Sequence, residues 1–247
     1  MAGYVCTIAG GNGGVGKTTT AINVAAVLEE RGYDTAVIDA DLAMPNVAEM
    51  LDVEFDHCLH DILASNSTIS ETLTKAPGGM TIVPGEPSLE AYAEADPSRL
   101  RMVARTLREA YDVVIIDTAT GLSKQTTIPM ELADGVILVT THDHVSLTDT
   151  GKTGKIATLV ESDIIGTLIV RATEETPLVA IDEEFEYPVL GGIPSDLDVV
   201  GDQPLVFESP DSDPAEAYRE LVTGLERVFF EGASGGDLGM VPQELVG

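Results

Sequence analysis

The chain has 247 residues, 44% of them hydrophobic, and its 42 acidic and 13 basic side chains give a formal net charge of -29. This length and apolar content can bury the core of one large α/β domain or of two small ones, and we favour one domain. The net charge argues against direct binding of DNA or anionic lipid, and the absence of an apolar run of about 18 residues argues against a membrane span.

The distribution of charges and cysteines narrows the class of protein further. Acidic residues are spread along the whole chain instead of forming one block, which is similar to proteins adapted to a salt-rich cytoplasm. High salt would screen this charge and weaken the argument against nucleic acid.

The N-terminus opens into an apolar run without a charged leader, so we predict a cytoplasmic protein without a signal peptide. Cys6 and Cys58 are too few and too poorly spaced for a disulfide framework, and we expect reduced core thiols.

Apolar β-branched runs alternate with helical patterns along the chain. In chain order the sequence predicts a strand at 4–9, a helix at 18–32, strands at 35–40 and 79–85, a helix at 98–110, a strand at 111–117, a helix at 125–133, a strand at 134–140, a helix at 148–162, a strand at 165–171 and a helix at 214–230. Gly32 is placed to end the first helix, and Pro214 lies in the first turn of the last one. This alternation predicts an α/β fold, a single-domain parallel β-sheet flanked by helices on both faces.

The segment GNGGVGKT at 11–18 fits the pattern G-x-x-x-x-G-K-[ST] between a predicted strand and a predicted helix. Such glycines let backbone N–H groups point at phosphate oxygens, and the helix N-terminus adds a positive partial charge. We expect Lys17 to contact the β- and γ-phosphates and the Thr18 hydroxyl to bind Mg²⁺. The residues predicted to contact nucleotide here are Gly11, Asn12, Gly13, Gly14, Val15, Gly16, Lys17, Thr18 and Thr19. An ordinary glycine-rich turn would leave this order of residues unexplained.

Acidic residues follow two of the predicted strands. Asp117 ends a buried apolar strand, as the metal-binding acid of a phosphate site does. Asp39 and Asp41 lie two apart at the end of another strand, and so on one side of the extended chain. We therefore predict that Asp39 and Asp117 join Thr18 at the metal, and that Asp39 and Asp41 act with Lys17 in catalysis.

These motifs, together with GGIPSD at 191–196, occur in the order found in MinD/ParA-type ATPases. The chain most resembles the MinD branch, over roughly residues 3–230, so that 1–231 would form the P-loop ATPase domain and the Gly-rich segment 232–247 a mobile tail. The resemblance implies that Asp41 orients the attacking water and that residues 117–121 form the second switch segment.

The same resemblance implies ligands and partners. ATP or ADP with Mg²⁺ would be the cofactors, and Arg171, Pro194 and Asp196 would contact the nucleotide. A nucleotide-dependent homodimer would form around two ATP molecules, and a protein partner would respond to it. The tail has no basic residue after Arg227, so we do not expect membrane docking, and we expect no direct nucleic-acid contact.

Three residues depart from the family pattern. Asn12 stands where the family carries a lysine that reaches the partner's phosphates, and an amide carries no charge. Ala119 replaces a proline of the second switch segment. Val170 replaces an asparagine that reads adenine, although Arg171 beside it could stack on the base or lie exposed. Lys124 is the nearest candidate for a replacement charge, with a solvent-facing lysine as the alternative.

Two further clusters of polar residues have weaker interpretations. His57 and His60 flank Cys58 with a spacing that could bind a metal, but no second cluster completes four ligands. The segment 142–144 follows a predicted strand and either contacts the nucleotide or a partner, or forms an exposed loop.

Three functions fit the residues. The leading hypothesis is a MinD-like ATP-binding switch that hydrolyses ATP slowly and helps position a division, motility or chemosensory assembly. The second is a nucleotide-bound scaffold without turnover. The third, a ParA-type partition ATPase that acts on DNA, is disfavoured by the net charge.

Overall fold

A computed structural model of the chain describes residues 2–121, 123–199 and 201–238. Within these residues, one eight-stranded sheet has the strand order β3-β4-β2-β5-β1-β6-β7-β8. The strands are β1 Tyr4–Ala9, β2 Thr35–Ala40, β3 Thr74–Lys75, β4 Thr81–Val83, β5 Val113–Thr118, β6 Gly135–Thr140, β7 Ile164–Ala172 and β8 Val189–Pro194. All neighbouring pairs are parallel except β3 and β4.

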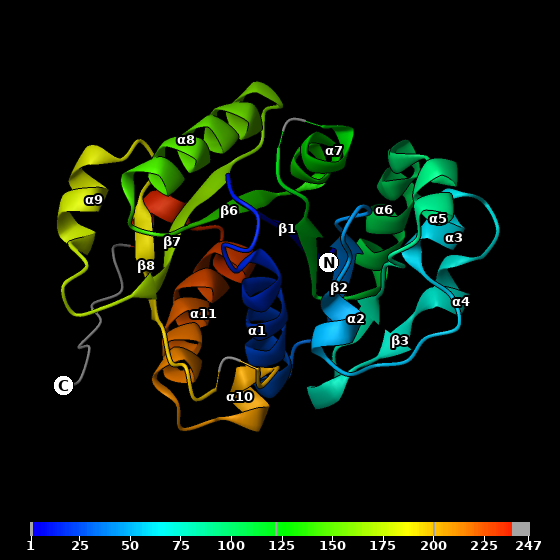
Figure 1. Cartoon of the computed structure of the whole chain (residues 1–247), viewed down its shortest axis with the longest axis horizontal. Coiled ribbons are helices and arrows are strands. Elements are labelled where there is room, and N and C mark those ends of the chain that lie inside the picture. Colours follow the sequence, from blue (N-terminus) through cyan, green and yellow to red (C-terminus); the bar gives the residue numbers. More distant parts are fainter. Residues whose placement is uncertain (1, 122, 200, 239–247) are drawn as a thin grey trace.

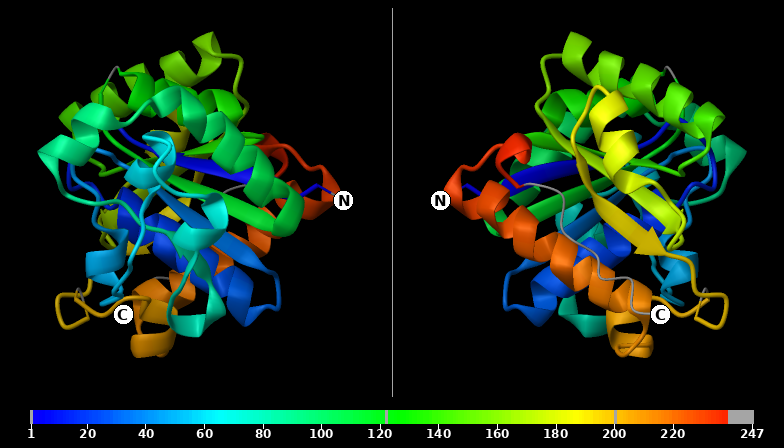
Figure 2. Two further views of the ribbon diagram at one scale, coloured as in Figure 1. Left: turned by 90° about the vertical axis from the view of Figure 1, so that its right-hand side faces the viewer. Right: turned by 90° about the vertical axis from the view of Figure 1, so that its left-hand side faces the viewer.

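Helices cover both faces of this sheet, as Figure 1 and the side views of Figure 2 show. The α-helices are α1 Lys17–Glu30, α2 Val47–Met50, α3 Leu59–Leu63, α4 Ile69–Thr72, α5 Leu89–Glu94, α6 Leu100–Ala110, α7 Lys124–Leu132, α8 His144–Leu159, α9 Leu178–Glu184, α10 Leu205–Glu208 and α11 Asp213–Glu231. Short 3-10 turns lie at Pro77–Gly79, Pro97–Arg99 and Gly235–Asp237. The helices α1 and α11 pack on one face, and α6, α7 and α8 lie on the other.

The predicted fold class is confirmed, with differences at element ends. The six predicted strands correspond to β1, β2, β4, β5, β6 and β7, and the five predicted helices to α1, α6, α7, α8 and α11. The helix expected to start at 148 begins at His144, because the Asp143 side chain caps it by accepting a hydrogen bond from Ser146 N at 3.0 Å. The strands β3 and β8 and the short helices were not predicted.

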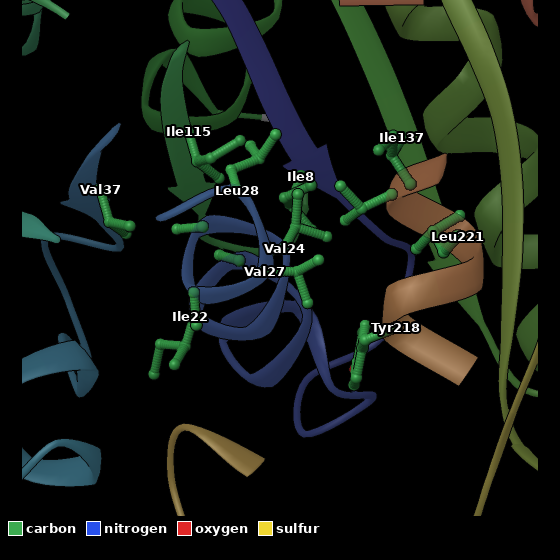
Figure 3. Close-up of a cluster of buried hydrophobic side chains, with 14 of the residues drawn as sticks. Ile8, Ile22, Val24, Val27, Leu28, Val37, Ile115, Ile137, Tyr218 and Leu221 are labelled. Carbon is green, nitrogen blue, oxygen red and sulfur yellow. The ribbon is translucent and has the colours of Figure 1, made fainter. Parts of the chain in front are cut away.

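The core lies in two layers because successive strand residues point to opposite faces of the sheet. On one face Ile8, Ile115 and Ile137 pack against helix side chains such as Leu28 and Leu221, and Figure 3 shows these groups pointing toward one another. Strand residues of the other face pack against α3 and α6. A parallel sheet buried on both faces in this way holds the carboxyl ends of its strands in fixed positions.

The helix α1 is the central element of the first layer. Most of its side chains are buried between the sheet and α11. It ends at Glu30, two residues before the predicted end, and Gly32 follows with a φ of 89° while Tyr33 N donates to Leu28 O at 3.0 Å. Its rigid packing fixes the loop that precedes Lys17.

The C-terminal part of the described chain continues beyond α11. Residues Gly235–Asp237 form a 3-10 turn against β7, so close that a Cβ added at Gly235 would lie 1.6 Å from Ile165 O. Residues 239–247 of the predicted tail lie outside the described residues. Over the ranges that are described, no helix combines the length and apolar character needed to cross a membrane.

Candidate functional site

A cleft of about 890 Å³ opens at the carboxyl end of the sheet, beside the loop that joins β1 to α1. The strand β1 lies between β5 and β6 in the sheet. The strand order reverses direction at β1, and open α/β sheets bind ligands at the carboxyl ends of the strands at such a point. The residues that line it include Gly13, Gly14, Val15, Gly16, Lys17, Thr18, Thr19, Asp41, Met44, Val170, Arg171, Pro194, Asp196, Gln203 and Tyr218. The cleft therefore collects most of the predicted nucleotide contacts.

The glycine loop is curled in the way that its sequence requires. Gly14 and Gly16 have φ values of 68° and 112°, a region that side chains disfavour. Gly16 also lies against β7, because a Cβ there would be 3.6 Å from a methyl carbon of Val170. Lys17 is 7% exposed, and this burial lowers the pKa of its ammonium group while the carboxylates of Asp117 and Asp41 oppose the shift.

Thr18 and Asp117 meet under this loop. Thr18 Oγ1 donates a hydrogen bond of 2.6 Å to Asp117 Oδ2, and Asp117 Oδ1 is buried without a hydrogen-bond partner. Burial raises the pKa of Asp117 to about 7, although the bond from Thr18 and the charge of Lys17 act against the rise. A hydroxyl and an unsatisfied carboxylate oxygen at a phosphate-binding loop fit the hard oxygen ligands that Mg²⁺ takes together with phosphates and water.

In the ranges that the structure describes, no group of three or more His, Cys, Asp or Glu side chains could hold a metal ion. The predicted metal-binding alternative at His57, Cys58 and His60 therefore has no such group among the described residues.

Asp39 lies next to Asp117 but has a different environment. The two residues are register partners in β2 and β5, and Asp39 is fully buried. Its Oδ2 accepts hydrogen bonds of 2.9 Å from the N–H groups of Asn46 and Val47, so this carboxyl holds the start of α2. Burial and the neighbouring Asp117 raise its pKa well above the ordinary value. Neither Asp39 nor Asp117 is among the residues that line the cleft.

Asp41, two residues further on, does line the cleft. Its side chain is half-buried, and its Oδ1 accepts a hydrogen bond from Met44 N at 3.1 Å. The spacing of the two acids predicted that they lie on one side of an extended chain, but β2 ends at Ala40 between them, and the Asp39 carboxyl lies in the core whereas Asp41 lies at the cleft.

Asn12 is directed away from the cleft and toward α8. In the amide orientation that satisfies both terminal atoms, Nδ2 donates to Gly11 O at 3.1 Å and to Asp149 Oδ2 at 3.2 Å, and Oδ1 accepts from Ser146 Oγ at 3.0 Å. Gly11 makes this approach possible, because a Cβ there would lie 2.4 Å from the Asp149 carbonyl carbon. Gly11 and Asn12 thus attach the loop to α8.

Arg171 reaches the glycine loop by an irregularity in β7. The register with β8 shifts between Val170 and Ala172, and Arg171 has a φ of 54°. Such bulges re-aim side chains next to binding sites. The guanidinium Nη2 donates to Gly14 O at 2.6 Å, and both Val170 and Arg171 line the cleft. Arg171 is exposed and its guanidinium is bound by the glycine loop, while its stacking on a base stays a prediction.

The remaining candidates lie outside the cleft. Lys124 is exposed at the start of α7, and His142, Asp143 and His144 are exposed at the start of α8, where Asp143 is the helix cap. None of these residues lines the cleft.

Two polar residues of the cleft wall, Gln203 and Tyr218, were not predicted from the sequence. Gln203 Oε1 accepts from Asn23 Nδ2 at 2.7 Å, and the Tyr218 hydroxyl lies 3.2 Å from Thr20 Oγ1. Both pairs are about 180 residues or more apart in the chain, so no local pattern could have indicated them.

Comparison with known proteins agrees with this geometry. Residues 3–164 match the AAA domain family. An ATP-binding protein of Methanocaldococcus jannaschii is 34% identical over 232 residues, covering 91% of this chain and 88% of the relative. The septum site-determining protein MinD of Pyrococcus horikoshii, solved with Mg-ADP, superimposes with a TM-score of 0.86 at 30% identity, covering 93% of this chain and 98% of that one. The chain belongs to the MinD/ParA-type P-loop ATPases. Within this family, the antiactivator FleN of Pseudomonas aeruginosa is 30% identical over 148 residues, covering 59% of this chain and 53% of the relative.

Proposed function

We propose that this ATPase-family protein is a MinD-like switch that binds ATP with Mg²⁺, hydrolyses it slowly and helps position a cellular assembly through nucleotide-dependent protein contacts. The observation that supports it most is the arrangement of Thr18, Asp117 and Lys17 beneath the curled glycine loop. Relatives named for septum site determination and for flagellum site determination support a division or motility assembly as the cargo.

The chain's own groups divide the work. The Lys17 ammonium would bind the β- and γ-phosphates, and the curled backbone at Gly14 and Gly16 would donate to phosphate oxygens. Thr18 Oγ1 and Asp117 would hold Mg²⁺, which when bound supplies positive charge to the phosphates. The Asp41 carboxyl, on the cleft wall, would orient the attacking water. Arg171, Pro194 and Asp196 would form the wall on the other side of the nucleotide.

Slow turnover follows from Asn12. The amide is neutral and is engaged by α8, so it adds no positive charge at the phosphates of either copy in a dimer. The same observation supports the second candidate, a nucleotide-bound scaffold without turnover. A DNA-partition role has no comparable support, given the net charge of -29.

The decisive test is nucleotide binding and turnover in molar salt, with Lys17→Ala as the paired variant. We expect wild type to bind ATP with Mg²⁺ by calorimetry and Lys17→Ala to lose this binding while its circular dichroism is unchanged. Equal nucleotide affinity in both proteins would contradict the assignment of the cleft. Binding without turnover would favour the scaffold, and retention on DNA that depends on salt would favour the partition ATPase.

A further inference from the structure

One buried histidine connects two loops at the edge of the nucleotide cleft. His60, in α3, is 1% exposed. Its Nδ1 accepts a hydrogen bond from Glu86 N at 3.2 Å, and its Nε2 lies 3.0 Å from Leu42 O. Leu42 directly follows Asp41, and Glu86 directly precedes Pro87, and both Asp41 and Pro87 line the cleft.

The hydrogen-bond partners fix the protonation of this ring. A backbone N–H can only donate, so Nδ1 carries no proton and accepts from Glu86. A neutral imidazole then carries its proton on Nε2, which donates to the carbonyl oxygen of Leu42. Both ring nitrogens of His60 are thus hydrogen-bonded. Nδ1 binds the segment after β4 and Nε2 binds the loop after β2.

The far end of the loop 41–46 is held as well. Asp39 Oδ2 accepts from the N–H groups of Asn46 and Val47. The loop also packs on the segment after β4, because a Cβ added at Gly85 would lie 2.3 Å from Pro45 Cβ. Within the loop Met44 N donates to Asp41 Oδ1, but the Met44 side chain is 75% exposed, so the loop is held mainly at its two ends.

We propose that His60 is a positioning residue that holds the loop 41–46, and with it Asp41, in place at the nucleotide cleft. It acts through the Nε2–H bond to Leu42 O and through the bond from Glu86 N, which ties the loop to the segment after β4. The effect of this loop on ATP turnover rests on the proposed function, whereas its attachment through the hydrogen bonds of His60 does not. An ordinary core histidine would contribute to the stability of the whole domain without a specific effect on the loop.

Two substitutions separate the two bonds of the ring. In His60→Gln the side-chain amide nitrogen occupies the position of Nε2 and keeps a donor for Leu42 O, while the acceptor for Glu86 N is lost. In His60→Asn the side-chain oxygen occupies the position of Nδ1 and keeps the acceptor, while the donor for Leu42 O is lost. Both variants remove the ring, and asparagine leaves a gap larger by one methylene, so the thermal stability of both variants is measured beside the loop readouts. His57→Asn is the control, because the His57 side chain is only half-buried and makes neither bond.

The first readout is amide hydrogen exchange of residues 41–46, measured without nucleotide. We expect His60→Asn to raise exchange in this loop about tenfold relative to His60→Gln, which is the scale of one net hydrogen bond. The second readout uses the absence of tryptophan from the chain. In a Met44→Trp background, His60→Asn should lower the fluorescence anisotropy of the single indole more than His60→Gln or His57→Asn does.

Turnover provides the third readout. With ATP, kcat should fall more in His60→Asn than in His60→Gln, about tenfold or more, while nucleotide affinity changes less than threefold. Loop exchange that rises in both variants no more than exchange in the rest of the domain, with equal losses of thermal stability, would overturn the proposal and leave His60 as a core residue. If even wild type shows no turnover, the proposed ATPase function fails, but exchange and anisotropy still decide the role of His60.

Discussion

At the scale of single residues, Asn12 sets the expected rate. A lysine in place of Asn12 is expected to raise the rate of ATP hydrolysis. However, Asp149 Oδ2 lies 3.2 Å from the amide nitrogen of Asn12 and would attract the added charge. A lysine at this position would meet the Asp149 carboxylate before it met any phosphate, and Asp149 already pairs with Lys152 at 2.8 Å.

We therefore predict that Asn12→Lys raises ATP turnover and ATP-dependent dimerisation, and that adding Asp149→Asn raises turnover further. One charged contact to the developing transition state contributes on the order of 3 kcal/mol, which sets an upper limit of about a hundredfold in kcat. Steady-state hydrolysis and mass in solution with a slowly hydrolysed ATP analogue measure both effects. Lys124→Ala is the control, because this exposed residue lies outside the cleft. Brisk turnover in wild type that disappears in Lys124→Ala would mean that Lys124 supplies the charge.

Asp117 and Asp41 should separate nucleotide binding from hydrolysis. Asp117 accepts from Thr18 and has a second buried oxygen without a partner, whereas Asp41 lines the cleft from the loop after β2. We expect Asp117→Asn to weaken Mg²⁺-dependent ATP binding about tenfold or more, and Asp41→Asn to keep binding but lose turnover. Calorimetry with and without Mg²⁺ gives the first effect, and a hydrolysis assay gives the second. Equal loss of nucleotide binding in both variants would show that these roles are divided wrongly.

At the scale of elements, the glycine loop is attached to α8 by close packing as well as by hydrogen bonds. A Cβ at Gly11 would lie 2.4 Å from the Asp149 carbonyl carbon and 2.6 Å from Thr150 N, whereas one at Gly13 would meet nothing within 4 Å. Gly11→Ala must therefore separate the loop from α8, while Gly13→Ala need not move either element.

Thermal unfolding of the nucleotide-free protein checks this difference. We expect Gly11→Ala to lower stability by about 1–3 kcal/mol, which is typical of overpacking, and Gly13→Ala to lower it by less than about 0.5 kcal/mol. Equal melting temperatures for the two variants would mean that the loop and α8 are not packed as closely as described.

The elements that the sequence predicts well are those with a local signal. The glycine loop, α1 and the buried strands β1, β2 and β5 each have a complete motif or an apolar run. The strand β8 was missed because Gly191 and Gly192 interrupt its apolar pattern. Helices such as α3 and α9 are too short to show a period, and they form because tertiary contacts hold them.

Side chains whose role depends on distant partners were beyond local patterns. Arg171 reaches Gly14 O only because a bulge and a left-handed backbone re-aim it, and neither feature has a sequence signal at a non-glycine residue. His60 was considered only as a metal ligand, since its actual partners, Leu42 and Glu86, lie 18 and 26 residues away. The glycine loop could therefore be located from its motif, while the contacts that position the residues around it required the fold.

At the scale of the whole molecule, carboxylates outnumber basic groups by 29, so most of them have no counter-charge on the chain. They are spread over the surface of one compact sheet domain, so folding brings like charges together and their repulsion opposes the folded state. The Debye length falls from about 10 Å at 0.1 M salt to about 3 Å at 1 M, which is shorter than most separations between surface charges.

We consequently predict that the nucleotide-free protein becomes more stable as KCl rises from 0.1 M to 2 M. A gain of about 2 kcal/mol would raise the melting temperature by about 4–8 °C for a domain of this size. Sucrose of equal osmolality is the control, because it strengthens apolar burial without screening charge, and it should raise the melting temperature less. A melting temperature that falls in KCl, or that rises equally in sucrose, would mean that repulsion among the acidic side chains does not limit the stability of this fold. The gain in KCl should also shrink when surface acids far from the cleft are replaced by amides, since each substitution removes part of the repulsion that salt screens.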